Sequence, residues 1–467
     1  MQVIKYLIYN FCKLVIWAGI RVYYDERIVV NKNQALIKGP CIVVSNHPST
    51  VLDPFNAVVY LPRIVYFLAN ASLFKNKVSA WLLNRLFCIP VERLKDTGGQ
   101  LLDNRASFVR AIRHLSGGGC MYIAPEGSSY VERHLRKLKT GVARIALDTE
   151  SENNFQLGLR ILPVGLNYSD PTKFRSQLLT VYGEPVRVAD FMQDYEEDRI
   201  RAVRKLTAHL EEKLQPLLIN TRDKAEDKLL AHLETILHHH APLPPYQEFL
   251  RAKKLLANLR VYEVSNPMGF AALRQQVLSY FKKIKATGTG DAGLSLPFRP
   301  AEGMALALSL PIAAVGYVSH FLPCFFAGKI NDWLNHDFDW MPTYKYIAGN
   351  ITYPLFICLQ LWLVGHFARP VWAWVYLFSL VPTGLVASWF LKKGKRFVEK
   401  WRAGSLANKK PRLMAELQVQ RKELEQQALQ LAISQVNLTR QAATVHSRRE
   451  PLRSAGNLAR HRGSLRE

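Results

Sequence analysis

The sequence has little cysteine and no pair of cysteines spaced for metal binding. Its 467 residues include six cysteines, and no Cys-x-x-Cys motif occurs among them. Single cysteines in apolar surroundings indicate a reducing compartment and argue against structural zinc. The run His238 to His240 could bind a metal adventitiously, but neighbouring histidines on a helix point in different directions. We therefore expect neither a metal nor a bound cofactor at the functional site. The cysteines are Cys12, Cys41, Cys88, Cys120, Cys324 and Cys358.

Acidic residues are also scarce. Asp and Glu number 37 against 62 Lys and Arg, which gives a formal net charge of +25. A chain this basic needs partners of negative charge, and nucleic acid or anionic lipid would each serve. No nucleic-acid-binding motif is present, so we expect anionic lipid headgroups and phosphorylated substrates as partners, and no nucleic acid. Most of the individual charges are expected to lie on solvated faces.

Three long stretches contain no Asp, Glu, Lys or Arg. They are residues 304–327, 346–368 and 371–391. Each is long enough to cross a bilayer as a helix, so 304–391 is predicted to hold two to three transmembrane helices. Buried core helices are the alternative. Basic residues precede 304 and follow 391, and three full crossings cannot place both flanks on the cytoplasmic side.

The N-terminal segment 1–26 is apolar but interrupted by Lys5, Lys13 and Arg21. These charges argue against a simple spanning helix, and no small-residue cleavage site of a secretory signal follows. The pattern favours an amphipathic helix lying in the membrane interface, with a helix packed on the domain core as the alternative.

The next region, 27–188, alternates short apolar runs with helical patterns. Strands are expected at 27–30, 41–44, 64–68, 89–92, 121–124, 161–164 and 178–182, and helices at 71–86, 99–116 and 139–148. This rhythm predicts an α/β fold with a mixed sheet and flanking helices. From 189 to 300 the strand pattern stops, so we expect a helical extension. The segment 392–467 is expected to be a basic tail, helical at first and then disordered.

The segment Ser45 to Pro54 combines a histidine and a carboxylate at the end of a predicted buried strand. A neutral imidazole, His47, can take a proton from a hydroxyl, and a carboxylate, Asp53, can fix its tautomer and stabilise the imidazolium. This pair suits acyl transfer to an alcohol. The alternative is purely structural, because Asp53 followed by Pro54 is also a good helix start, with Asp as the N-cap.

Three further predicted strands also end in polar or charged side chains. Cys88 to Arg93 ends in an arginine, and Met121 to Tyr130 passes from an apolar strand into Pro, Glu, Gly and hydroxyl residues. Ile161 to Tyr168 is an apolar strand containing Pro and Gly. Because the carboxyl ends of strands carry the chemistry in many α/β enzymes, these loops are candidate site elements.

In order and content these four blocks resemble those of the glycerolipid acyltransferase superfamily, the glycerol-3-phosphate and 1-acylglycerol-3-phosphate acyltransferases, and the chain looks like a bacterial-type membrane member. The resemblance covers about residues 39–186. It implies that His47 and Asp53 are catalytic, that Arg93 binds the substrate phosphate, and that Glu126, Gly127 and Ser128 shape the acceptor pocket. The fourth block, within 161–165, is associated with acyl-donor binding.

The sequence departs from the family pattern at three places. Five residues separate His47 from Asp53, where four is the common number. Neither spacing aligns the two side chains on one helical face, so they are expected to meet across a turn. The longer spacing is similar to that of some glycerol-3-phosphate acyltransferases.

The other two departures lie in the third block. Ser129 stands where Arg often follows this block, and Ala124 stands where Phe is usual. The phosphate would then be held by Arg93, with Lys139 or its basic neighbours Arg133, Arg136 and Lys137.

Together these features predict a membrane-bound O-acyltransferase of phospholipid biosynthesis. It would move a fatty acyl group from acyl-CoA or acyl carrier protein to glycerol 3-phosphate or dihydroxyacetone phosphate, with the catalytic domain facing the cytoplasm. One alternative keeps the chemistry and takes 1-acylglycerol 3-phosphate as the acceptor. An alternative of another class is a catalytically silent membrane scaffold.

Overall fold

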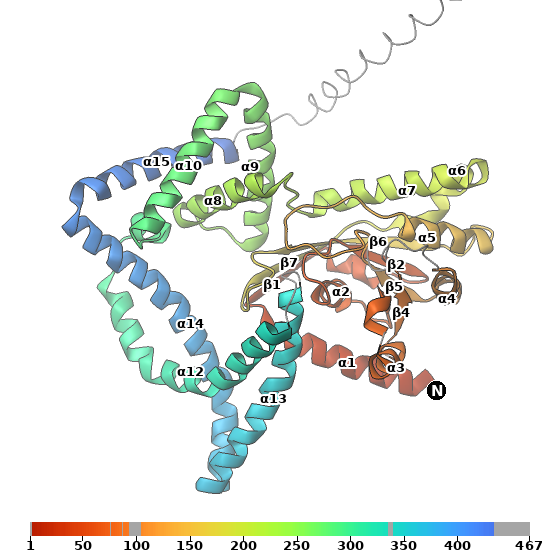
Figure 1. Ribbon diagram of the computed structural model, residues 1–467, viewed down its shortest axis with the longest axis horizontal. Helices are drawn as coiled ribbons and strands as arrows, with labels where there is room; N and C mark the ends of the chain where they lie inside the picture. Colours follow the sequence, from red (N-terminus) through yellow and green to blue (C-terminus); the bar gives the residue numbers. More distant parts are fainter. Residues whose placement is uncertain (1, 75, 86, 93–103, 335–339, 434–467) are drawn as a thin grey trace, which may run out of the picture.

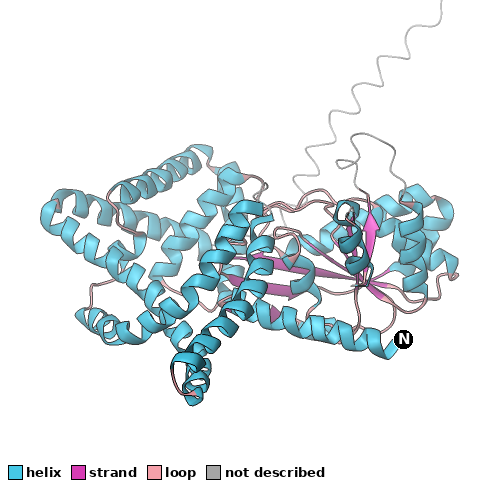
Figure 2. Ribbon diagram, turned by 60° about the horizontal axis from the view of Figure 1, so that its bottom comes forward, coloured by secondary structure: helices cyan, strands magenta, loops and turns pink. Residues whose placement is uncertain are grey.

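The computed structural model describes residues 2–74, 76–85, 87–92, 104–334 and 340–433. Its strands gather in one half of the molecule, and the other half is wholly helical (Figure 2). An eight-stranded sheet has the order β1-β7-β6-β2-β5-β3-β4, with β8 paired to β6. The strands are β1 Glu26–Val30, β2 Cys41–Ser45, β3 Tyr66–Asn70, β4 Cys88–Val91, β5 Cys120–Ile123, β6 Arg160–Tyr168, β7 Gln177–Tyr182 and β8 Val186–Arg187.

The sheet is mixed, as predicted from the sequence. β6, β2, β5, β3 and β4 run parallel to one another, β1 is parallel to β7, and β6 is antiparallel to β7 and β8. All seven strands expected from the apolar runs are present, and only the short β8 was not anticipated. The expected helix at 71–86 is instead a 3-10 turn, Ala71–Phe74, followed by the helix α3, Lys77–Arg85.

Helices cover both faces of the sheet. Along β2 the side chains alternate, so Ile42 and Val44 face one layer while Cys41 and Val43 face the other. The first layer contains α4 Arg105–Ser116, α5 Gly141–Glu152 and α7 Arg199–Leu214, and the second contains α1 Gln2–Tyr23 and α2 Leu52–Val58. Burial on both faces explains why the strands are nearly continuous apolar runs.

The helical half contains a bundle that joins two parts of the chain far apart in sequence. Its core holds Leu230, Leu233 and Val277 from the extension and Leu417 and Leu424 from near the C-terminus. The latter two lie in the part of the basic tail that was predicted to be helical, and that helix is present. It packs on the extension, which the sequence did not predict, because its apolar side chains need a partner face. The bundle helices are α8 Lys224–His240, α9 Pro245–Ser265, α10 Pro267–Ala286, α11 Asp291–Ser295 and α15 Pro411–Ile433. α6 Met192–Glu197 precedes α7 beside the sheet.

Four described helices are long and apolar enough to cross a membrane. They are α1, α12 Pro300–Leu334, α13 Met341–Phe367 and α14 Pro370–Lys409. α1 runs beneath the sheet, while α13 and α14 form a hairpin that extends away from it (Figure 1). The apolar outer surfaces of α12, α13 and α14 are largely exposed, which argues for lipid contact rather than burial in a protein core.

Candidate functional site

The predicted site residues that the structure describes meet at one edge of the sheet because the strands that precede them are parallel. β2, β5 and β6 are neighbours with the same direction, so their carboxyl ends lie side by side. His47 follows β2, Glu126 follows β5, and Tyr168 ends β6. Arg93, two residues beyond β4, lies outside the described residues.

His47 and Asp53 are in direct contact. The Nδ1 atom of His47 lies 2.9 Å from Oδ2 of Asp53, and the exposed fractions of the two side chains are 17% and 0%. If Nδ1 carries the proton and donates to this carboxylate, Nε2 keeps its lone pair for a substrate proton. His47 also lines the large cavity described below.

The helix-cap interpretation of Asp53 is wrong. Val51 is the N-cap of α2 and makes no side-chain capping bond, and Asp53 lies within the first turn. The Asp53 carboxylate instead accepts hydrogen bonds from the Tyr168 hydroxyl at 2.7 Å and from the Ser49 backbone N–H at 2.6 Å. These donors satisfy a buried charge and fix the carboxylate against the imidazole.

A tight turn lets the five-residue spacing bring the pair together. Thr50, in the middle of the turn, has a φ of +42°, a left-handed conformation that β-branched residues rarely adopt. Such a conformation costs about 1–3 kcal/mol and persists only where surrounding contacts fix it. The Thr50 backbone N–H donates to Oγ of Ser129 at 3.0 Å, and its side chain contacts Thr343 of α13.

Glu126 ties the loop after β2 to the segment that follows β5. One carboxylate oxygen accepts the His47 backbone N–H at 2.9 Å, and the other accepts the Arg136 backbone N–H at 3.2 Å. Burial raises the pKa of Glu126, and these two N–H groups offset only part of that effect. Glu126 therefore positions backbone around the site, a role that its sequence motif does not reveal.

Gly127, Ser128 and Lys139 form one wall of the site. Gly127 has a φ of +74°, and a Cβ there would lie 3.4 Å from Cγ of Lys139, so glycine suits both the turn and the packing. The Ser128 hydroxyl donates to the Gly127 carbonyl at 2.8 Å. The Lys139 backbone N–H donates to the Pro125 carbonyl at 2.7 Å, and its side chain lines the cavity.

A cavity of about 2040 Å³ opens beside His47. Part of its lining is apolar and comes from α1 and α2, including Val15, Ile16 and Phe55. Another part is basic and comes from the segment after β5. The basic lining residues there are Arg136, Lys137, Lys139 and Arg144. A molecule with a long apolar chain and a phosphorylated polar end matches both parts of this lining.

Arg136 differs from the other basic residues of the cavity because it is partly fixed. Its guanidinium lies 3.9 Å from the Tyr130 ring centroid and donates to Glu132 at 2.7 Å. Within the described chain, no acceptor lies within hydrogen-bond distance of its buried Nε. The guanidinium of Arg133, in contrast, is bound by Asp227 and Glu234, so Arg133 is not a candidate phosphate ligand.

Two site residues were missed by the sequence reasoning. Tyr168 holds Asp53, and the only sequence signal was its place at the end of a strand parallel to β2. Thr343 lies almost three hundred residues from the His47 loop in sequence, and nothing in its local pattern links it to that loop. Among the described residues, no three His, Cys, Asp or Glu side chains converge in a way that could hold a metal ion.

Part of the chain is similar to known acyltransferases. Residues 21–167 match the family model Acyltransferase. The chain is 30% identical over 125 residues to glycerol-3-phosphate O-acyltransferase 1 of Saccharomyces cerevisiae, covering 26% of this chain and 16% of that protein. It is 32% identical over 198 residues to glycerol-3-phosphate O-acyltransferase 2 of the same yeast, covering 41% and 25%. The matched segments therefore span a quarter or less of these relatives.

A solved structure is also similar. The crystal structure of the 1-acyl-sn-glycerophosphate (LPA) acyltransferase PlsC from Thermotoga maritima aligns with a TM-score of 0.31 and 21% identity, covering 43% of this chain and 78% of that chain.

Residues 21–167 thus match an acyltransferase domain, and parts of the chain are similar to parts of glycerol-3-phosphate O-acyltransferases.

Proposed function

We propose that this protein is a membrane-bound O-acyltransferase that moves a fatty acyl group from an acyl thioester to glycerol 3-phosphate or dihydroxyacetone phosphate, a step of phosphatidic acid synthesis. The observation that carries the proposal is the contact between His47 and the buried Asp53 beside a cavity with apolar and basic walls. The curated yeast relatives are named glycerol-3-phosphate O-acyltransferases, which supports this acceptor.

In the proposed mechanism His47 is the general base. Its Nε2 takes the proton of the acceptor hydroxyl as the oxygen attacks the thioester carbonyl carbon. The tetrahedral intermediate collapses, the carbon–sulfur bond breaks, and the imidazolium returns the proton to the thiolate. The products are the ester and a free thiol. Asp53 stabilises the imidazolium, and general-base assistance of this kind is worth about 100- to 10,000-fold in rate.

The two walls of the cavity would divide the substrates between them. The apolar residues contributed by α1 and α2 would receive the acyl chain, and Lys137, Lys139 and Arg136 would attract the phosphate. Arg93 remains a predicted phosphate ligand. The donor would be acyl-CoA or acyl carrier protein, with no bound cofactor. Because such thioesters are made in the cytoplasm, the catalytic domain would face that side, with anionic lipids near its basic flanks.

The test is transfer of a labelled acyl group by the full chain in nanodiscs. Acyl-CoA and acyl carrier protein would be offered as donors, with glycerol 3-phosphate and 1-acylglycerol 3-phosphate as parallel acceptors. We expect transfer to glycerol 3-phosphate that falls at least 100-fold in His47→Ala, because the base is removed. His209→Ala is the control, since His209 lies near Glu212 and Phe191 and does not line the cavity beside His47.

Two results would redirect the proposal. Preferential acylation of 1-acylglycerol 3-phosphate would establish the lysophospholipid alternative, with the same roles for His47 and Asp53. Transfer to neither acceptor, or transfer equal in His47→Ala and the unmutated protein, would reject both and leave the scaffold alternative.

A further inference from the structure

The first turn of α13 reaches the loop that carries the candidate catalytic pair. Thr343 is 1% exposed, and its Oγ1 accepts the Val51 backbone N–H at 3.1 Å. The same hydroxyl is hydrogen-bonded to the hydroxyl of Thr50. Thr50 and Val51 lie between His47 and Asp53, so a residue from the C-terminal membrane region contacts the turn that brings the pair together.

The position of Thr343 is fixed by its own helix. Pro342 occupies the first turn of α13, where its restricted φ favours the helix start. One turn further on, the Tyr346 hydroxyl donates to the Ile16 carbonyl of α1 at 3.0 Å, and its ring lies 6.4 Å from that of Phe55 on α2. α13 is thus attached to both helices beneath the site before it extends into the hairpin.

The loop between His47 and Asp53 contains a strained residue that needs contacts from other segments. Thr50 adopts the left-handed φ of +42°, and the residues on either side of it determine where the His47 ring and the Asp53 carboxylate lie. On the sheet side, Ser129 accepts the Thr50 backbone N–H. Thr343 contacts the same turn from α13, so contacts from two distant segments fix one strained residue.

We propose that Thr343 is a positioning residue, which acts through the Thr50 turn to keep the His47 and Asp53 pair in its reactive geometry. The acyltransferase domain would then depend on the C-terminal membrane helices for its active-site geometry. This inference rests on the proposed acyl transfer for its kinetic test, but the contact itself can be tested without any substrate.

The kinetic test uses three variants of the full chain in nanodiscs. Thr343→Val removes the hydroxyl and keeps the shape, and Thr343→Ser keeps the hydroxyl. Thr352→Val is the matched control, because Thr352 lies on the same helix and donates to the Pro323 carbonyl at 3.1 Å, away from the site. We expect Thr343→Val to lower kcat about tenfold with KM for both substrates within about twofold, since small misplacements of reacting groups are costly. Thr343→Ser should keep at least half of kcat, and Thr352→Val should keep all of it.

The structural test is hydrogen exchange of the loop amides. Thr343→Val removes the acceptor of the Val51 N–H, so this amide should exchange faster, whereas Thr343→Ser and Thr352→Val should leave it unchanged. Unchanged exchange in Thr343→Val, or a kcat loss shared by Thr343→Ser or Thr352→Val, would overturn the proposal. If the unmutated protein transfers to no acceptor, the proposed function fails, and the exchange result alone decides whether Thr343 holds the loop.

Discussion

At the scale of single residues, two buried carboxylates at the site have different partners. Asp53 accepts hydrogen bonds from the Tyr168 hydroxyl and the Ser49 amide while it contacts the His47 ring. Among the described residues, Glu126 accepts hydrogen bonds from two backbone N–H groups, those of His47 and Arg136. Asp53 therefore acts on the imidazole itself, whereas Glu126 holds the backbone on which the imidazole is carried.

Glu126 should make stability depend on pH in a definite direction. Burial raises its pKa above 4.5, so between that pH and its folded pKa the folded protein binds more protons than the unfolded chain. Stability from this group therefore falls as pH rises through the window, by about 1.4 kcal/mol per unit of pKa shift. Glu126→Gln removes the titrating carboxyl group and with it this loss of stability. The thermal midpoint of the variant should therefore rise relative to that of the unmutated protein from pH 4.5 upward and then level off.

Glu226→Gln is the control for this measurement. Burial would raise the pKa of Glu226, but hydrogen bonds from the Arg260 side chain and the Arg222 amide lower it overall. Its stabilising effect is therefore lost only as pH falls below about 4.5, and above about pH 5 its midpoint should keep a constant offset. If the thermal midpoints of both variants changed with pH in the same way relative to the unmutated protein, the pH dependence could not be assigned to Glu126.

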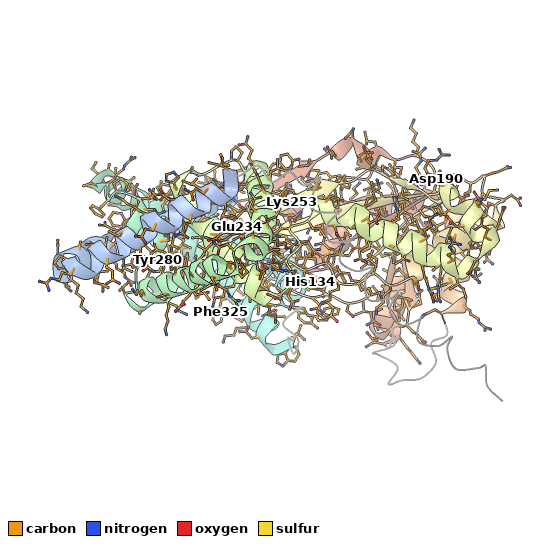
Figure 3. The ribbon with its side chains drawn as sticks, turned by 90° about the horizontal axis from the view of Figure 1, so that it is seen from above. His134, Asp190, Glu234, Lys253, Tyr280 and Phe325 are labelled. Carbon is orange, nitrogen blue, oxygen red and sulfur yellow. The ribbon has the colours of Figure 1, made fainter. Side chains whose placement is uncertain are left out.

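At the scale of elements, the bundle supports the segment that follows β5. Figure 3 shows the α/β half with Asp190 at one end, the bundle with Tyr280 at the other, and His134 and Glu234 between them. Nδ1 of His134 lies 2.6 Å from the Thr221 carbonyl, and the Arg133 guanidinium donates to Asp227 and Glu234. The basic residues of the cavity follow directly in sequence, so the extension orders them.

Arg133→Met should loosen this junction. It leaves Asp227 and Glu234 without their cation, at a cost of about 1–3 kcal/mol, and should lower the thermal midpoint by several degrees. It should also speed proteolysis at 131–138. Arg201→Met is the control, since its pair with Glu197 is exposed at 4.0 Å and such pairs contribute little. Equal losses in the two variants would contradict a structural role specific to Arg133.

At the scale of the whole molecule, α12 bends so that its two halves pack on different helices. Near its start Glu302 binds Lys400 of α14, and further along the Ser319 carbonyl accepts from Gln360 of α13. Beyond the bend, the Pro323 carbonyl accepts from Thr352, which is nearer the start of α13. Figure 1 shows both ends of α12 on the side away from the turn that joins α13 and α14. Prolines at 311 and 323 explain the bend, because each removes a helical N–H.

This path predicts a topology with only α13 and α14 as full crossings. One cysteine at a time, at Glu184, Asp332 or Ala368, would be introduced after Cys12, Cys324 and Cys358, which are not buried, are replaced by Ala. An impermeant maleimide should label the first two sites from one side of the membrane and Ala368→Cys, in the turn between α13 and α14, from the other. This arrangement keeps the basic residues before α12 and after 391 on one side, as the positive-inside rule requires.

The labelling pattern has clear contrary outcomes. Asp332→Cys labelled together with Ala368→Cys would mean that α12 crosses fully. Glu184→Cys and Ala368→Cys labelled from the same side would mean that the hairpin does not cross.

The sequence alone determined the features that depend on local pattern. The apolar runs predicted seven strands and the mixed α/β fold, because burial on both faces leaves a signal in each strand. Charge-free stretches predicted the long apolar helices. The blocks around His47 and Glu126 predicted a site at strand ends, since parallel neighbours end at one edge.

Only the tertiary structure decided what depends on contacts between distant segments. The donor from Tyr168 to Asp53, the packing of α15 on the extension and the bend that returns α12 toward its starting side have no local signature. The contact of Thr343 with the catalytic turn is of the same kind. A hydroxyl carries no pattern that names its partner, so these pairings are set by how the whole chain packs.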